Sequence, residues 1–130
     1  MDIVVSQDEG RIPVTVFRLN GDLTSEEPLK SQAEEAYQAG TRDLLLDLTE
    51  VPYISSSGLR AIHYVYDLLQ SDATDEEQQE MLRGITAGTY AFQHLKLLKP
   101  SKNASKALRV AGYDMFLEIH DKYKDAIASF

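Results

Sequence analysis

The sequence contains no cysteine, which excludes a disulfide framework and thiolate-based metal or redox chemistry. It also lacks any apolar run that approaches the roughly twenty residues of a membrane-spanning helix. Its first residues carry neither the basic region nor the long apolar region of a secretory signal. These absences favour a cytoplasmic protein with no membrane insertion.

Positive charge is scarce. The chain has 13 Lys and Arg against 21 Asp and Glu, a net charge of −8. Since a nucleic-acid surface needs clustered cations, no nucleic-acid partner is expected, and a basic surface on another protein is the better match. The basic residues are scattered except for four that recur around one turn, which we expect on a solvated face: Lys96, Lys99, Lys102 and Lys106.

Motifs for catalysis and cofactor binding are missing as well. There is no Gly-x-x-x-x-Gly-Lys-Ser/Thr phosphate loop, no Gly-x-Gly-x-x-Gly and no Gly-x-Ser-x-Gly. The three histidines, His63, His94 and His120, are dispersed and do not have metal-ligand spacing. We therefore expect no cofactor, no metal and no enzymatic activity.

Length and periodicity indicate a single domain spanning residues 1–130. Residues 3–6 and 12–19 resemble a hairpin, the second strand being partly apolar on both faces. The apolar run at residues 44–48 predicts a strand covered on both sides. Helical spacing follows at residues 29–37 and, most regularly, at residues 59–69.

The remaining elements are predicted from capping and turn residues. Thr24 or Ser25 is expected to cap the first helix, with Glu27 completing a capping box and Pro28 in the first turn. A strand at 94–99, a helix from Ser101 or Asn103 to Gly112, a strand at 115–119 and a short helix capped by Asp121 complete the chain. The order ββαβαβαβα predicts an α/β fold with a mixed, mostly parallel sheet and helices packed against it. The acidic residues 72–93 interrupt this order as an expected insertion.

The most distinctive segment is residues 44–62, a buried strand followed by a short loop and the helix start Ser55-Ser56-Ser57-Gly58-Leu59. Together with Gly21-Asp22-Leu23 before the first helix and residues 111–116 before the last strand, it resembles the signature of the STAS domain family. That family contains the anti-sigma factor antagonists, also called anti-anti-sigma factors. The resemblance covers nearly the whole chain apart from residues 72–93.

The resemblance implies a partner-switching regulator. Proteins of this type bind an anti-sigma factor with a histidine-kinase-like ATPase fold. That kinase phosphorylates a serine at the helix start and so releases the complex, and a phosphatase restores binding. Aligned through Gly58 and Leu59, the acceptor falls on Ser56, with Ser57 as the alternative. A helix N-terminus accommodates a phosphate, whereas the added charge disfavours a docked partner.

The sequence departs from the family pattern at two positions. Ser55 and Thr24 stand where the family usually has aspartates, which favours an alternative: a STAS adaptor, or a subunit of a larger complex such as a transporter, that is not phosphorylated. The serines also suit a purely structural role as helix cap and exposed filler. A third reading, an enzyme or small-ligand site beside the second helix, has no supporting motif. The partner-contact positions that the resemblance implies are Pro52, Tyr53, Ser55, Ser56, Ser57, Gly58, Arg60, Asp22 and Thr24.

Overall fold

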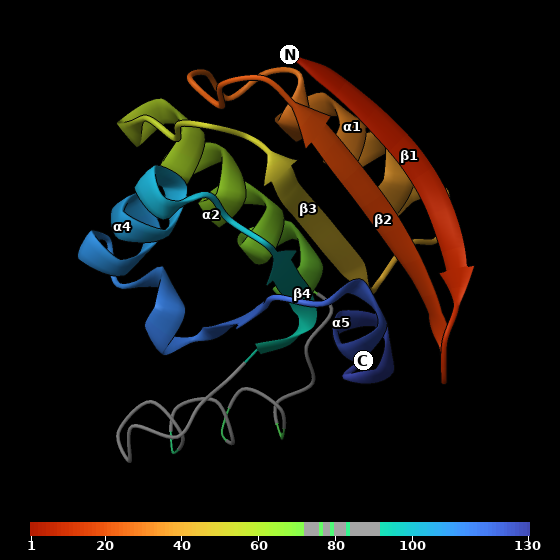
Figure 1. Ribbon diagram of the computed structural model, residues 1–130. Helices are drawn as coiled ribbons and strands as arrows, with labels where there is room; N and C mark the ends of the chain where they lie inside the picture. The colour runs from red at the N-terminus through yellow and green to blue at the C-terminus, as the bar shows by residue number, and fades with distance from the viewer. Residues whose placement is uncertain (72–75, 77–78, 80–82, 84–91) are drawn as a thin grey trace.

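A single five-stranded sheet, with the strands in chain order, organises the protein (Figure 1). The computed structural model describes residues 1–71, 76, 79, 83 and 92–130. The first two strands are antiparallel and every later pairing is parallel, which confirms the predicted α/β fold with a mixed, mostly parallel sheet. The strands are β1 (Asp2–Glu9), β2 (Pro13–Asn20), β3 (Leu44–Glu50), β4 (Phe92–Leu98) and β5 (Leu117–His120).

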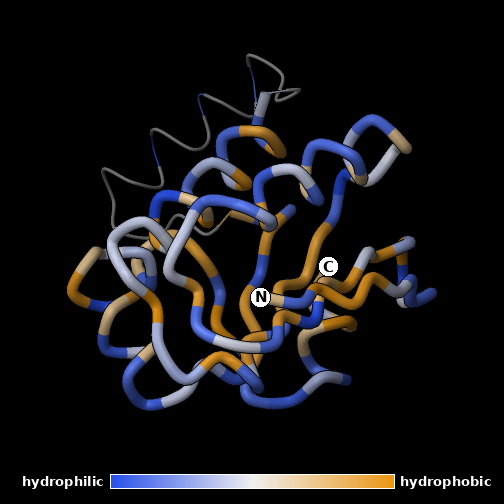
Figure 2. The backbone as a smooth tube through the Cα atoms, turned by 90° about the horizontal axis from the view of Figure 1, so that it is seen from above, coloured by the Kyte–Doolittle hydropathy of each residue, from blue (hydrophilic) through white to orange (hydrophobic). Residues whose placement is uncertain are grey.

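Helices cover both faces of this sheet, unequally. Of the helices in the described part of the chain, α1, α2 and α4 lie on one face, while the short α5 lies on the other (Figure 1). Figure 2 shows the backbone from above, with several hydrophobic stretches running through the middle of the molecule. In the described part of the chain, no helix is long and apolar enough to cross a membrane. The helical elements are α1 (Leu29–Gln38), α2 (Ser56–Gln70), α4 (Lys102–Val110), the 3₁₀ turn η1 (Tyr113–Met115) and α5 (Tyr123–Ala128).

The central strand β3 supplies apolar side chains to both faces. Leu44 and Leu46 belong to the large core under α1, α2 and α4, and Leu45 belongs to the smaller core under α5. Because successive strand side chains point to opposite faces, a strand covered on both sides reads as a continuous apolar run. The same alternation puts Phe17 of β2 in the large core and Val16 in the small one.

The predicted start of the first helix is wrong. Helix α1 begins at Leu29, its N-cap is Pro28, and no side chain caps it. The reason is a long-range contact: Leu23 forms a parallel bridge with Ile54, which holds the chain extended beside the loop after β3. The capping box of Thr24 and Glu27 therefore does not form.

The predicted Asp121 cap is also wrong, since α5 begins at Tyr123 after an extended Lys122 and has no side-chain cap. By contrast, of the two caps predicted for α4, Ser101 and Asn103, Ser101 is the one used, its Oγ accepting from the backbone N–H of Ala104 at 3.1 Å. Several strand boundaries also differ from the predicted ones. Strand β5 begins at residue 117 because η1 occupies residues 113–115, and β4 begins at residue 92, inside the expected insertion. The remainder of that insertion lies outside the described residues, apart from residues 76, 79 and 83.

Lys96 does not lie on a solvated face, contrary to the sequence prediction. It sits in β4 with its side chain fully buried. Its Nζ donates to the Ser129 carbonyl oxygen at 2.7 Å and to the Ser129 Oγ at 2.9 Å, and it lies 3.1 Å from a carboxylate oxygen of Glu118. A buried charge needs such partners, and here they fasten the end of the chain over the small core.

Candidate functional site

The fold brings the two predicted contact segments together at the end of β3. Besides the bridge between Leu23 and Ile54, the N–H of Leu23 donates to the Tyr53 carbonyl at 2.9 Å, and the N–H of Ser55 donates to the Leu23 carbonyl at 2.9 Å. The residues on either side of Leu23, Asp22 and Thr24, are exposed. Residues 22–24 and residues 52–60 therefore form one continuous surface.

Gly58 is buried at the centre of this junction. A Cβ atom at this position would lie 2.2 Å from the Leu23 carbonyl oxygen and 2.9 Å from the Leu23 Cγ. The close backbone approach at Gly58 is therefore made to Leu23 within the chain.

The three consecutive serines have three different environments. Ser55 is the N-cap of α2, and its Oγ accepts from the Gly58 N–H at 3.2 Å. The Ser57 Oγ accepts from the Arg60 guanidinium at 2.9 Å. Ser56 is exposed, and among the described residues its hydroxyl has no hydrogen-bond partner. The cap role that the sequence allowed for one serine belongs to Ser55, so Ser56 is left available.

The electrostatic surroundings of Ser56 suit a negative charge. It is the first residue of the 15-residue α2, where the positive end of the helix dipole and unpaired N–H groups stabilise anions. The exposed Arg60 guanidinium lies one turn further along the helix, 3.9 Å from a carboxylate oxygen of Glu26. Arg60 thus links the start of α2 to the acidic segment that precedes α1.

A groove of about 540 Å³ runs between the start of α2 and α4. Ser56 and Leu59 line one wall and Lys106 and Val110 line the other. Tyr53 also lines the groove, with 48% of its surface exposed. The sequence analysis missed the α4 wall of this groove. One residue could have indicated this wall. Val110 is an apolar residue at the end of α4, and in the structure 81% of its surface is exposed.

Two hydrogen bonds hold the groove walls in place. The Ser101 Oγ donates to the Pro52 carbonyl at 3.1 Å, which ties the start of α4 to the loop after β3. The Tyr113 hydroxyl donates to the Leu59 carbonyl at 2.8 Å, which ties η1 to α2. Because both bonds join segments about fifty residues apart in the sequence, the groove is a product of the tertiary fold.

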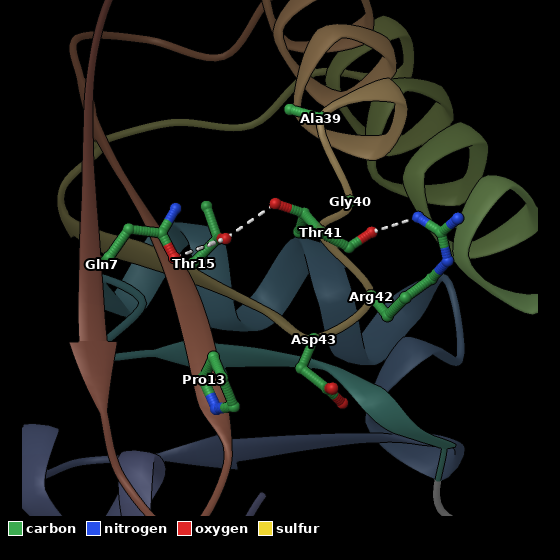
Figure 3. A pocket seen from close by; sticks show the side chains of 8 residues that line it. All are labelled: Gln7, Pro13, Thr15, Ala39, Gly40, Thr41, Arg42 and Asp43. Carbon is green, nitrogen blue, oxygen red and sulfur yellow. Dashed lines mark hydrogen bonds between the residues drawn. The ribbon is translucent and has the colours of Figure 1, made fainter.

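A second pocket lies near the opposite ends of the parallel strands, between the end of α1 and the start of β3 (Figure 3). Its hydroxyl groups bond to one another: the Thr15 and Thr41 Oγ1 atoms are 2.8 Å apart, and Thr15 also donates to the Gln7 Oε1 at 3.2 Å. Arg42 donates to the Thr41 carbonyl at 2.8 Å. No residue of the predicted contact surface lines this pocket.

The three histidines lie apart, each beside one carboxylate. His63 pairs with Asp67 at 3.1 Å, and the other two pair with Asp43 and Glu118 at 2.8 and 3.1 Å. Within residues 1–71, 76, 79, 83 and 92–130, no three His, Cys, Asp or Glu side chains are grouped as metal ligands.

The chain belongs to the STAS domain family, whose sequence model matches residues 4–75, more than half of the chain. No curated protein sequence matches it. Solved anti-sigma factor antagonists share its fold. The antagonist from Mycobacterium paratuberculosis is 18% identical with a TM-score of 0.68, over 98% of this chain and 92% of that one.

The Bacillus cell fate determinant SpoIIAA, also an anti-sigma factor antagonist, is similar in two states. Its phosphorylated form is 16% identical with a TM-score of 0.64, over 97% of this chain and 96% of that one. The unphosphorylated form is 15% identical with a TM-score of 0.62, over 95% of this chain and 92% of that one. These similarities establish a common fold.

Proposed function

We propose that this chain is a cytoplasmic anti-sigma factor antagonist that works by partner switching. Its partner is a kinase-type anti-sigma factor, a serine kinase with a histidine-kinase-like ATPase fold, and phosphorylation of Ser56 releases the complex. The observation that carries the proposal is the state of the three serines. Ser55 is used as a cap and Ser57 is bonded to Arg60, whereas Ser56 is exposed at the helix start and lines a groove.

The proposed contact surface combines apolar and charged groups. Pro52 and Tyr53 are exposed on the loop after β3, Arg60 is exposed on α2, and Asp22 and Thr24 lie alongside. An exposed tyrosine is a suitable interface anchor because it offers a large rigid apolar body with a polar tip. The chain contributes to function by binding and not by catalysis.

Phosphorylation at Ser56 would change the surface and leave the fold intact. A phosphate adds about −1.5 to −2 charges at pH 7. The α2 dipole stabilises that charge at the first helical residue, so the free phosphorylated protein remains folded. In the complex the same charge must be desolvated against the partner, which weakens binding. A serine phosphatase would then regenerate the binding form.

The missing carboxylates at Ser55 and Thr24 affect the kinase reaction and not the docking geometry. Ser55 caps α2 through its hydroxyl as an aspartate would through its carboxylate. The kinase must therefore orient the Ser56 hydroxyl with its own residues. The alternative, an adaptor that binds permanently, retains the same surface without the switch.

The test is a calorimetric binding titration with the kinase-type anti-sigma factor encoded nearest to the gene of this chain, without ATP. Ser56→Asp places a negative charge in the contact surface, and the matched control Ser6→Asp places it on the exposed edge of β1. We expect Ser56→Asp to weaken binding at least about tenfold, or about 1.4 kcal/mol, and the control to bind like wild type. Equal effects of the two substitutions, or no complex with wild type, would contradict the proposed function.

A further inference from the structure

Helix α4 concentrates positive charge in an otherwise acidic protein. Lys102, Lys106 and Arg109 are exposed and follow one another at positions i, i+4 and i+7, which places them along one face of the helix. Helix α4 contains no acidic residue, and none of the three cations forms an ion pair within the described part of the chain. In a chain of net charge −8, this basic stripe is a local reversal of sign.

Helix stability does not account for the stripe. Arg109 lies in the last turn, where a cation suits the helix dipole, but Lys102 is the first helical residue, where the dipole disfavours positive charge. The three cations also repel one another at spacings that bring side chains together. Their arrangement is better explained by an external negative partner.

Exposed apolar groups lie beside the stripe. Val110 and Met115 are 81% and 77% exposed. In the described part of the chain, no other large hydrophobic side chain is as exposed as these two. Val110 and Ala107 line the groove of about 540 Å³ together with Ile54 and Leu59. Ser56, Asn103 and Lys106 are polar members of the same lining. A mostly apolar concave surface with a small number of placed polar groups is typical of a binding site.

We propose that this α4 groove, with the stripe of Lys102, Lys106 and Arg109 at its edge, binds an acidic segment of a protein partner. An apolar side chain of that segment inserts against Ala107 and Val110, and flanking carboxylates lie against the three cations. The charge complementarity selects an acidic occupant, and the concave shape selects an inserted side chain over a lipid surface. The net charge of −8 also opposes approach to an anionic bilayer.

This inference deepens the proposed function and rests on it for one point, namely that the same face docks the partner. Ser56 and Lys106 line the same groove. A phosphate on Ser56 therefore presents negative charge where the acidic segment lies, and repulsion between the two expels the segment. The cations of α4 attract an acidic segment, and a phosphate on α2 repels that same segment. A modification on α2 can therefore control release.

The test is a titration of the ¹⁵N-labelled chain with synthetic peptides, followed by amide chemical shifts. The probe is a blocked peptide with two central leucines flanked by glutamates. Comparison peptides carry glutamine in place of glutamate, or serine in place of leucine. We expect saturable shifts at Leu59, Ala107 and Val110 with the probe, and affinities at least about fivefold weaker with either comparison peptide.

The matched variants are the triple charge reversal Lys102→Glu, Lys106→Glu, Arg109→Glu, and the control Lys124→Glu on α5, an exposed lysine on the other side of the sheet. The triple variant should lose at least about tenfold in affinity for the probe, and the control should retain it. Equal affinity for glutamate and glutamine peptides, or shifts confined to other surfaces, would overturn the proposal. So would stronger binding to phosphatidylglycerol vesicles than to the probe.

The same variants separate this inference from the proposed function. If the kinase-type anti-sigma factor binds the triple variant as tightly as wild type, the α4 groove is not its contact and this inference fails while the proposed function stands. If the probe binds as expected but the kinase-type protein does not bind the chain, the groove assignment stands and the proposed function fails.

Discussion

The carbonyl oxygen of Leu23 lies 2.2 Å from the point at which a Cβ atom on residue 58 would stand. This single relationship fixes the geometry of the candidate site. It presses the segment before α1 against the first turn of α2, and it brings Asp22 and Thr24 beside the serines. Only glycine permits the approach, because the opposing atom belongs to the backbone and cannot rotate away.

Replacing Gly58 should therefore destabilise the protein. In Gly58→Ala the added methyl group overlaps the Leu23 carbonyl, and overpacking of this kind costs about 1 to 3 kcal/mol. Urea unfolding measures the change in the free energy of unfolding. The control Ser57→Ala, one residue earlier, removes only an exposed hydrogen bond to Arg60 and should lie within about 0.5 kcal/mol of wild type. An unchanged midpoint for Gly58→Ala would show that Leu23 is not held in this position.

The Ser55 cap gives a second stability prediction. Ser55→Ala removes the acceptor of the Gly58 N–H and should cost about 1 kcal/mol. Ser55→Asp keeps an acceptor at the cap and should be close to wild type in the same unfolding experiment. Equal losses for the two variants would mean that the hydroxyl of Ser55 does not cap α2.

The environment of Tyr123 predicts that the folded protein loses stability at alkaline pH. Burial of the phenol, with the hydrogen bond from its hydroxyl to the Asp8 carboxylate at 2.6 Å and the nearby negative charge, raises the pKa of Tyr123 from 10 to about 12. Between these values the folded chain holds a proton that the unfolded chain has lost, so stability falls as pH rises from about 10 to about 12.

The measurement is the difference between wild type and Tyr123→Phe. Ultraviolet absorbance should show one phenol titrating near pH 12 that the variant lacks, and the slope of unfolding free energy against pH over this window should be shallower in the variant. Asp8→Asn, which removes the charge and keeps a hydrogen-bond acceptor, should lower the Tyr123 pKa. A Tyr123 that titrates at pH 10 would contradict the contact with Asp8.

The contacts of Lys96 predict that this residue holds α5 on the sheet. Lys96→Met removes the bonds to the Ser129 carbonyl and hydroxyl and the ion pair with Glu118. We expect a loss of about 2 kcal/mol, since the Glu118 carboxylate is partly exposed and keeps its contact with His120. In this variant, amide hydrogen exchange should accelerate more in α5 than in α2. The exposed control Lys124→Met should change stability by less than about 0.5 kcal/mol, and a similar result for Lys96→Met would contradict the anchoring role.

The sequence predicted those parts of the fold that depend on neighbouring residues. The apolar runs of β2 and β3 predicted that both faces of these strands are buried, and the regular apolar spacing after Ser55 predicted α2. The failures have long-range causes. Thr24 does not cap α1 because Leu23 bridges to Ile54, a contact between segments about thirty residues apart.

Lys96 was misplaced for a similar reason. A spacing of three or four residues suggests one helical face, but this lysine lies in β4 and its partners, Glu118 and Ser129, come from β5 and the segment after α5. The α4 wall of the groove was also invisible to spacing, since the bond from Ser101 to the Pro52 carbonyl sets it against α2. The candidate acceptor followed from the sequence, whereas its surroundings followed only from tertiary packing.

The central claim is that Ser56 is the switch, and intact-mass analysis after incubation with ATP and the kinase-type anti-sigma factor tests it most directly. Wild type and Ser57→Ala should each gain a single phosphoryl group, and Ser56→Ala should gain none while still forming the complex. A phosphoryl group that persists in Ser56→Ala would contradict the assignment. A stable complex with no phosphorylation of wild type would contradict the switch and identify the chain as a permanent adaptor.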